Sequence, residues 1–167
     1  IGGAVSGAHG YDAVNAAPHI ALKVPLPRPL TSMTLAEIQA WIDESPDQSH
    51  AVGKFQITAK TLRETQARLA MSGDQVFDAQ TQDRMAHLLY RDAGLDDYLG
   101  GGISLDKFMA QLAIIWPELP GLDGVSLYHG QTDHRATVTR THYAETMRTI
   151  FALKTNESAW ETAVFRL

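Results

Sequence analysis

Apolar side chains recur at helical spacing between residues 34 and 44. These apolar positions are Leu35, Ile38, Trp41 and Ile42. Thr34 and Glu37 fit a capping box, in which each side chain accepts a hydrogen bond from the backbone amide of the other residue. Ser45-Pro46 then ends the pattern, because a proline moves the residue before it out of the helical region. The spacing predicts a helix over 34–44.

Similar patterns predict four further helices. Their expected ranges are about 58–70, from Asp78 to near Gly94, from Ser104 to Pro117, and about 134–153. The first of them has a second capping box in Thr61-Leu62-Arg63-Glu64, and Asp78 and Ser104 are N-cap candidates for the next two. Trp160, Val164 and Phe165 mark a short apolar tail.

The first 57 residues lack such helical spacing apart from 34–44. Residues 1–30 are rich in Gly, Ala and Pro, and the prolines of the segment 23–29 predict extended backbone there. Phe55 and Ile57 alternate with polar positions for a short stretch before the next helix. The pattern therefore predicts a mainly helical α+β protein with a small irregular or β part around residues 10–57.

Composition favours an ordinary globular protein. The 167 residues are 44% hydrophobic and 20% charged, and no apolar run approaches the roughly 20 residues that cross a bilayer. The formal net charge of −5 argues against nucleic-acid binding, because polyanions are attracted by an excess of Lys and Arg. The chain starts at Ile1 without Met or a leader, so we interpret it as a mature fragment from which targeting information has been removed.

Metal and cofactor sites are not predicted. The absence of cysteine excludes disulfides and thiolate metal ligands, and the seven histidines do not form a zinc-type spacing such as H-E-x-x-H. Gly100-Gly101-Gly102 suits a turn between helices rather than a phosphate-binding loop. We expect no metal and no cofactor.

Three groups of segments, in a fixed order along the chain, carry a family signature. They are Ala4-Val5-Ser6-Gly7 with Gly10-Tyr11-Asp12-Ala13-Val14-Asn15, then Gly53-Lys54-Phe55-Gln56-Ile57 with Gln82-Asp83, then Ile115-Trp116-Pro117-Glu118-Leu119-Pro120-Gly121 with Tyr128-His129-Gly130-Gln131. Together they resemble the phage-lambda-lysozyme-like muramidase and lytic transglycosylase family. The resemblance extends from Ile1 to about Phe151.

The resemblance implies a lysozyme-like fold, with a helical lobe facing a small β or irregular lobe across a cleft. Residues 1–153 are then a single lysozyme-like domain, and residues 154–167 form a C-terminal tail that packs on it. The floor of the cleft is expected at Gly53 to Ile57.

Val5 stands where the resemblance places the family's catalytic glutamate. Such enzymes use a glutamate as the proton donor to the leaving oxygen of the glycosidic bond, and valine has no proton to donate. Four other carboxyl groups are the nearest possible substitutes in sequence: Asp12, Asp43, Glu44 and Asp47. The alternative explanations for Val5 are an introduced change and an error in our alignment of this segment.

A glycan groove needs aromatic faces for the apolar side of a sugar ring, together with side chains that donate and accept hydrogen bonds. The expected substrate-binding residues are Ser6, Tyr11, Gly53, Lys54, Phe55, Gln56, Tyr128 and Gln131. For Phe55 and Tyr128 the alternative is a place in the hydrophobic core, because burial of an aromatic ring removes a large apolar area from water.

The leading hypothesis is therefore a degenerate lysozyme-like domain that binds the glycan strands of peptidoglycan without efficient cleavage. The first alternative is an active muramidase or lytic transglycosylase that cleaves the β-1,4 bond between N-acetylmuramic acid and N-acetylglucosamine. The second is a protein-interaction module on a lysozyme scaffold, with a protein partner. The expected partner is peptidoglycan or a related amino-sugar polymer, with a place in the cell envelope, periplasmic or exported, or a phage origin.

Overall fold

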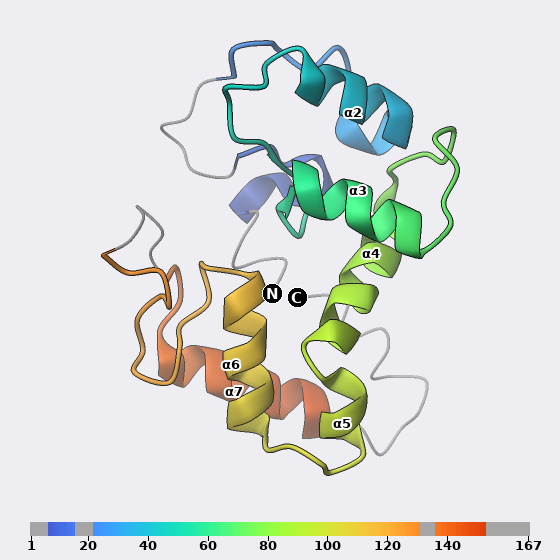
Figure 1. Ribbon diagram of the computed structural model, residues 1–167. Helices are drawn as coiled ribbons and strands as arrows, with labels where there is room; N and C mark the ends of the chain where they lie inside the picture. Colours follow the sequence, from blue (N-terminus) through green and yellow to red (C-terminus); the bar gives the residue numbers. More distant parts are fainter. Residues whose placement is uncertain (1–6, 16–21, 131–135, 153–167) are drawn as a thin grey trace. The chain divides into compact units, whose positions relative to one another are not determined.

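The computed structural model describes residues 7–15, 22–130 and 136–152, and it is mainly helical with one small sheet (Figure 1). This confirms the predicted mainly helical α+β class. The chain divides at residues 88 and 89 into two compact units, here called the N-terminal unit and the C-terminal unit. No helix within the described ranges has the length and apolar character needed to cross a membrane. The predicted tail, residues 154–167, lies outside these ranges.

The N-terminal unit combines short helical segments with a two-stranded hairpin. In chain order its elements are the 3₁₀ helices η1 (Gly7–Asp12) and η2 (Leu30–Ser32), α2 (Leu35–Asp43), β1 (Ala51–Val52), β2 (Ile57–Thr58), α3 (Ala59–Arg68) and most of α4 (Ala79–Asp92). The strands are antiparallel, with Ala51 opposite Thr58 and Val52 opposite Ile57. A single bridge from Val14 to Val52 attaches the segment after η1 to this hairpin.

Helix α2 begins as the sequence predicts. The Thr34 side chain accepts a hydrogen bond from the Glu37 amide, and the Glu37 carboxylate accepts one from the Thr34 amide, so both bonds of the capping box are formed. The apolar face that the spacing predicts is buried, comprising Leu35, Ile38, Trp41 and Ile42.

Helix α3 begins one turn earlier than its predicted cap. Its N-cap is Thr58, whose side chain accepts from the Thr61 amide, so the proposed box at Thr61-Leu62-Arg63-Glu64 is wrong. The Thr61 hydroxyl lies 2.9 Å from the Thr58 hydroxyl instead. Thr58 ends strand β2, and its extended backbone is the conformation that an N-cap requires.

The C-terminal unit holds three further helices: α5 (Leu95–Leu99), α6 (Leu105–Ile115) and α7 (Arg140–Ala152). Ser104 caps α6 as predicted, by accepting from the Lys107 amide. Helix α7 starts at Arg140, later than the predicted 134, and α5 was not predicted. Gly94, with φ of +86°, allows the turn from α4 into α5 because glycine adopts positive φ without steric cost.

Asp78 caps the start of α4 as predicted, accepting from the Thr81 amide at 2.8 Å.

An aromatic cluster forms part of the core of the C-terminal unit. The rings of Tyr98 and Phe108 are stacked with centroids 5.3 Å apart, and Phe151 of α7 meets the Tyr98 ring edge-on at 4.8 Å. Tyr90 packs against Trp116 with ring centroids 5.4 Å apart. The Trp-Pro segment after α6 thus contributes a buried side chain to this core.

The N-terminal unit buries a titratable histidine. His50 is 4% exposed, its Nε2 lies 3.1 Å from the Ser45 hydroxyl, and its ring contacts Trp41 edge-on. Burial lowers the pKa of His50 below its usual range, and a hydrogen bond to the backbone of Gln48 opposes this only in part. The fold therefore favours neutral His50.

We expect this histidine to make the protein less stable in mild acid. The unfolded chain binds a proton at the ordinary histidine pKa of about 6.5, whereas folded His50 binds it only at lower pH. The free energy of unfolding should therefore fall as the pH drops below about 6.5. Urea unfolding at pH 7.5 and 5.5 measures this, and His50→Gln should show a smaller loss than the wild type. Exposed His142→Gln is the control, and an equal loss in wild type and His50→Gln would exclude His50 as the cause.

Candidate functional site

Five of the predicted substrate-binding residues lie together in the N-terminal unit. Tyr11 comes from η1, and Gly53, Lys54, Phe55 and Gln56 form the turn between β1 and β2. The turn is closed by a hydrogen bond from the Gln56 amide to the Gly53 carbonyl at 3.1 Å, and the Gln56 side chain donates to the same carbonyl at 2.9 Å. Gln56 thus holds the turn with its own side-chain amide.

Gln82 of α4 connects this turn to Tyr11. Its side chain is completely buried, and its Oε1 accepts from the Lys54 amide at 2.9 Å. Its Nε2 donates to the backbone carbonyls of Tyr11 and Phe77, both at 3.0 Å. One amide side chain therefore satisfies three backbone groups from segments far apart in sequence, which fixes the position of Lys54 relative to Tyr11.

Asp83, the next residue on α4, contacts the polar side of Tyr11. The Tyr11 hydroxyl donates to Asp83 Oδ1 at 2.9 Å. The Lys54 ammonium lies 5.0 Å from the centre of the Tyr11 ring and 5.6 Å from that of Phe55, within the range of a cation–π interaction. The half-buried side chains of Tyr11, Lys54 and Asp83 are here called the tyrosine cluster.

The titration of the tyrosine cluster is set mainly by burial. Burial raises the pKa of the Asp83 carboxyl, while the Tyr11 hydroxyl and the Lys54 charge act in the opposite direction. Burial likewise lowers the pKa of Lys54, and the Asp83 charge opposes this. The pKa of Tyr11 lies well above its usual range because of burial and the neighbouring Asp83. The phenol therefore stays protonated and keeps its hydrogen bond to Asp83.

Phe55 packs against Tyr11 of the tyrosine cluster. Its side chain is 0% exposed, and its ring meets the Tyr11 ring edge-on with centroids 6.5 Å apart. A ring without exposed surface offers no face for sugar stacking in this arrangement. Its expected contact with substrate stays a prediction, and its observed contact is with Tyr11.

The remaining predicted site residues belong to other parts of the chain. Tyr128 belongs to the C-terminal unit, where its hydroxyl donates to the Ile114 carbonyl at 3.0 Å. Val5, Ser6 and Gln131 lie outside the described residues, so the site at the missing acid stays a prediction. No group of three or more potential metal ligands occurs in the part of the chain that the structure describes.

The four carboxyl groups considered as replacement acids are all exposed: Asp12, Asp43, Glu44 and Asp47. Asp12 accepts from the Thr31 amide at 2.8 Å, and Asp43 pairs with Arg63 at 2.6 Å. None of the four has the burial in apolar surroundings on which a general acid of this kind depends. Asp83 was not among these candidates, although Gln82-Asp83 was part of the sequence signature, because sequence alone does not show that it meets Tyr11.

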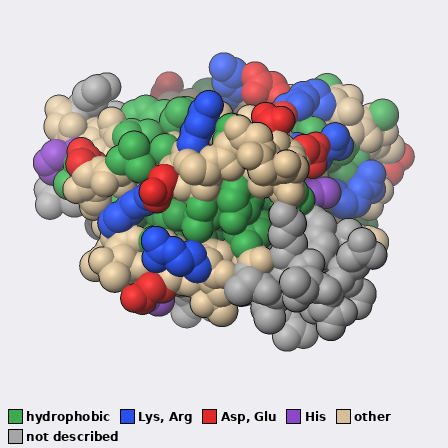
Figure 2. Space-filling model, turned by 90° about the horizontal axis from the view of Figure 1, so that it is seen from below, with side chains coloured by type: hydrophobic (Ala, Val, Ile, Leu, Met, Phe, Trp, Pro, Cys, Tyr) green, Lys and Arg blue, Asp and Glu red, His purple; other side chains and the backbone are tan. Residues whose placement is uncertain are grey.

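The charges on the face displayed in Figure 2 are mixed. Basic and acidic side chains lie next to each other on this face, with hydrophobic side chains between them. The formal net charge of the whole chain is −5. Attraction of a polymer is therefore expected from a local site rather than from long-range charge.

Comparison with known proteins identifies the family. No curated protein and no solved structure matches the chain. The model of the family described as Endolysin matches residues 8–150, a range that includes the tyrosine cluster and the helices from α2 to α7 apart from the last residues of α7. The chain therefore belongs to the Endolysin family, lysozyme-like proteins that act on peptidoglycan.

Proposed function

We propose that this protein binds the glycan strands of peptidoglycan through the tyrosine cluster and cleaves them poorly or not at all. The observation that supports the binding part is that Gln82 connects the backbones of Tyr11 and Lys54 at the Gly53–Gln56 turn, while Asp83 accepts a hydrogen bond from the Tyr11 hydroxyl. The cluster offers an aromatic ring, a hydroxyl, an ammonium and a carboxylate side by side. These are the groups that recognise the ring faces, hydroxyls and N-acetyl groups of amino sugars.

The proposal of poor cleavage rests on Val5. In the muramidase family that the sequence resembles, this position supplies the proton donor, and a valine removes it. Family membership supports peptidoglycan as the ligand and is consistent with a phage-encoded protein that acts on the cell wall. An interaction with a protein partner finds no support in the described site.

A second candidate function is cleavage with Asp83 as the acid. Its favouring observation is the half-buried position of Asp83, where burial raises its pKa toward that of a proton donor. Against it, the Tyr11 hydroxyl and the Lys54 charge both stabilise the ionised carboxylate. We therefore assign Asp83 to binding and to the positioning of Tyr11.

Co-sedimentation with purified peptidoglycan tests the binding site. Tyr11→Phe removes the hydroxyl that joins the ring to Asp83, and Asp83→Asn removes the charge beside Lys54. Each is expected to weaken binding about tenfold, the effect of a lost hydrogen bond to a charged group. Asp74→Asn, the same change at an exposed position of the same unit, should bind as the wild type does.

The same samples separate the two candidate functions. If wild type releases soluble fragments at an enzymatic rate and Asp83→Asn does not, Asp83 is the acid and the binding-only proposal is wrong. If all the variants bind equally well, the tyrosine cluster is not the glycan site. Circular dichroism on each variant checks that the fold is retained.

A further inference from the structure

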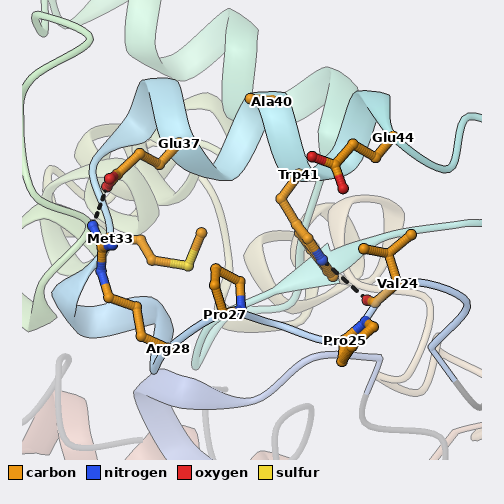
Figure 3. Close-up of a pocket in the computed structure, with 9 residues that line it drawn as sticks. All are labelled: Val24, Pro25, Pro27, Arg28, Met33, Glu37, Ala40, Trp41 and Glu44. Atoms are coloured by element: carbon orange, nitrogen blue, oxygen red, sulfur yellow. Dashed lines mark hydrogen bonds and ion pairs between the residues drawn. The ribbon is translucent and has the colours of Figure 1, made fainter.

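A pocket lies in the N-terminal unit, and none of the tyrosine cluster residues lines it (Figure 3). It is a pocket of about 300 Å³, formed where the proline-rich segment 24–28 runs along helix α2. Its lining residues are Val24, Pro25, Pro27, Arg28, Met33, Glu37, Ala40, Trp41 and Glu44. This volume lies at the lower end of the range for small-ligand pockets, which suits a side chain or a short peptide.

The floor and walls of the pocket are apolar. Met33 and Trp41 are 1% and 4% exposed and form its base, while Pro25, Pro27 and Ala40 are exposed and form its sides. The Trp41 Nε1 already donates to the Val24 carbonyl at 3.1 Å, a bond that also holds the proline segment against α2. The inner surface therefore attracts aliphatic groups.

Charge is confined to the two ends of the pocket. At one end Arg28 pairs with Glu37 at 2.5 Å, and the Arg28 Nε donates to the Ser32 carbonyl. Because guanidinium has five N–H donors, Arg28 keeps donors for a further acceptor. At the other end lies Glu44, whose carboxylate has neither a hydrogen bond nor an ion pair among residues 7–15, 22–130 and 136–152.

The spacing of the two ends limits the length of a ligand, and their charges limit its chemistry. Glu37 and Glu44 are seven residues apart on and at the end of α2, which corresponds to about 10 Å along a helix. One positive and two negative side chains give the lining a net charge of −1, so a cation is favoured at the Glu44 end, and the Arg28 end can take a carboxylate. A ligand with an ammonium, an aliphatic stretch and a carboxylate fits this order.

We propose that this pocket binds the peptide stem of peptidoglycan, with the primary ammonium of its diamino acid at Glu44 and a carboxylate at Arg28. This inference rests on the proposed function, because it takes peptidoglycan as the polymer that the protein binds. The tyrosine cluster then contacts the glycan, and the pocket contacts a peptide of the same polymer. With this pocket, the protein would bind peptide-bearing glycan strands more tightly than bare glycan.

Calorimetric titration of the full chain with a synthetic stem peptide tests the proposal. The probe is the N-acetylated tetrapeptide L-alanyl-γ-D-glutamyl-L-lysyl-D-alanine, and its partner probe has the lysine ammonium acetylated. Acetylation of the probe and Glu44→Gln are each expected to weaken binding about three- to tenfold, as loss of one partly exposed charge pair. Ala40→Phe fills the pocket at an exposed helix position and should abolish binding. Glu64→Gln, which changes an exposed glutamate of α3, is the matched control.

The outcomes separate this inference from the proposed function. No binding of the stem peptide, or equal binding by wild type, Glu44→Gln and Ala40→Phe, would overturn the pocket assignment. If wild type then still sediments with peptide-free glycan strands, the proposed function stands without the pocket. If the peptide binds as expected but glycan strands do not, the pocket stands and the tyrosine cluster is not a glycan site.

Discussion

Replacing Val5 by glutamate is expected to raise the rate of peptidoglycan cleavage by at least about 10²-fold, the lower range for a general acid. The sequence resemblance places a glutamate at this position in active muramidases, next to Ser6, which this chain retains. If the remaining site is intact, the new carboxyl group supplies the missing proton to the leaving oxygen. Release of soluble fragments from purified peptidoglycan, followed by mass spectrometry, measures the gain.

Val5→Gln is the matched control for this change. Glutamine has nearly the shape of glutamate but has no acidic proton, so it should leave the rate at the wild-type level. Equal rates for the glutamate and glutamine variants would show that an acid at position 5 does not restore cleavage. The proposal that Val5 makes cleavage poor would then be wrong.

Replacing Gly53 by alanine is expected to destabilise the protein by about 3 kcal/mol and to abolish glycan binding. Gly53 has φ of +75°, where an L-residue other than glycine costs about 1–2 kcal/mol. Its new Cβ would lie 2.2 Å from Gln82 Oε1 and 2.7 Å from Gln82 Cδ. Gln82 cannot move aside without breaking its hydrogen bonds to Lys54, Tyr11 and Phe77, each worth about 1 kcal/mol net.

Gly101→Ala separates the cost of an alanine at positive φ from the cost of the clash with Gln82. Gly101 has φ of +80°, and a Cβ added there would meet no heavy atom of the described residues within 4 Å, so this change carries the conformational cost alone. Urea unfolding should show a clearly larger loss for Gly53→Ala than for Gly101→Ala, and only the former should fail to sediment with peptidoglycan. Similar losses would mean that the Gln82 contact does not hold the site together.

Local elements of the fold could be predicted where a short pattern determines them. Thr34 and Glu37 form the expected capping box because both partners lie within one helical turn. The cap of α3 was misplaced because Thr58 and Thr61 have the same side chain, and the choice between them depends on the strand that ends at Thr58. The start of α7 was placed too early, at 134 instead of Arg140, because apolar spacing alone does not mark where a helix begins.

The candidate site was predictable only in part. The family signature indicated Tyr11, Lys54 and Gln56, and the structure brings their segments together in one unit. It did not indicate that Gln82 joins them or that Asp83 holds the Tyr11 hydroxyl, because those contacts span 28 to 72 residues. Local periodicity carries no information on such distant partners. The pocket between the proline segment and α2 escaped prediction for the same reason.

We propose that this Endolysin family member binds peptidoglycan without cleaving it. The most direct measurement incubates the wild-type protein with purified peptidoglycan, then quantifies in one sample the protein that sediments and the fragments that are released. We expect the protein to sediment with the polymer while soluble fragments stay at the level of a protein-free sample. Release of fragments at the rate of an active muramidase would contradict the claim.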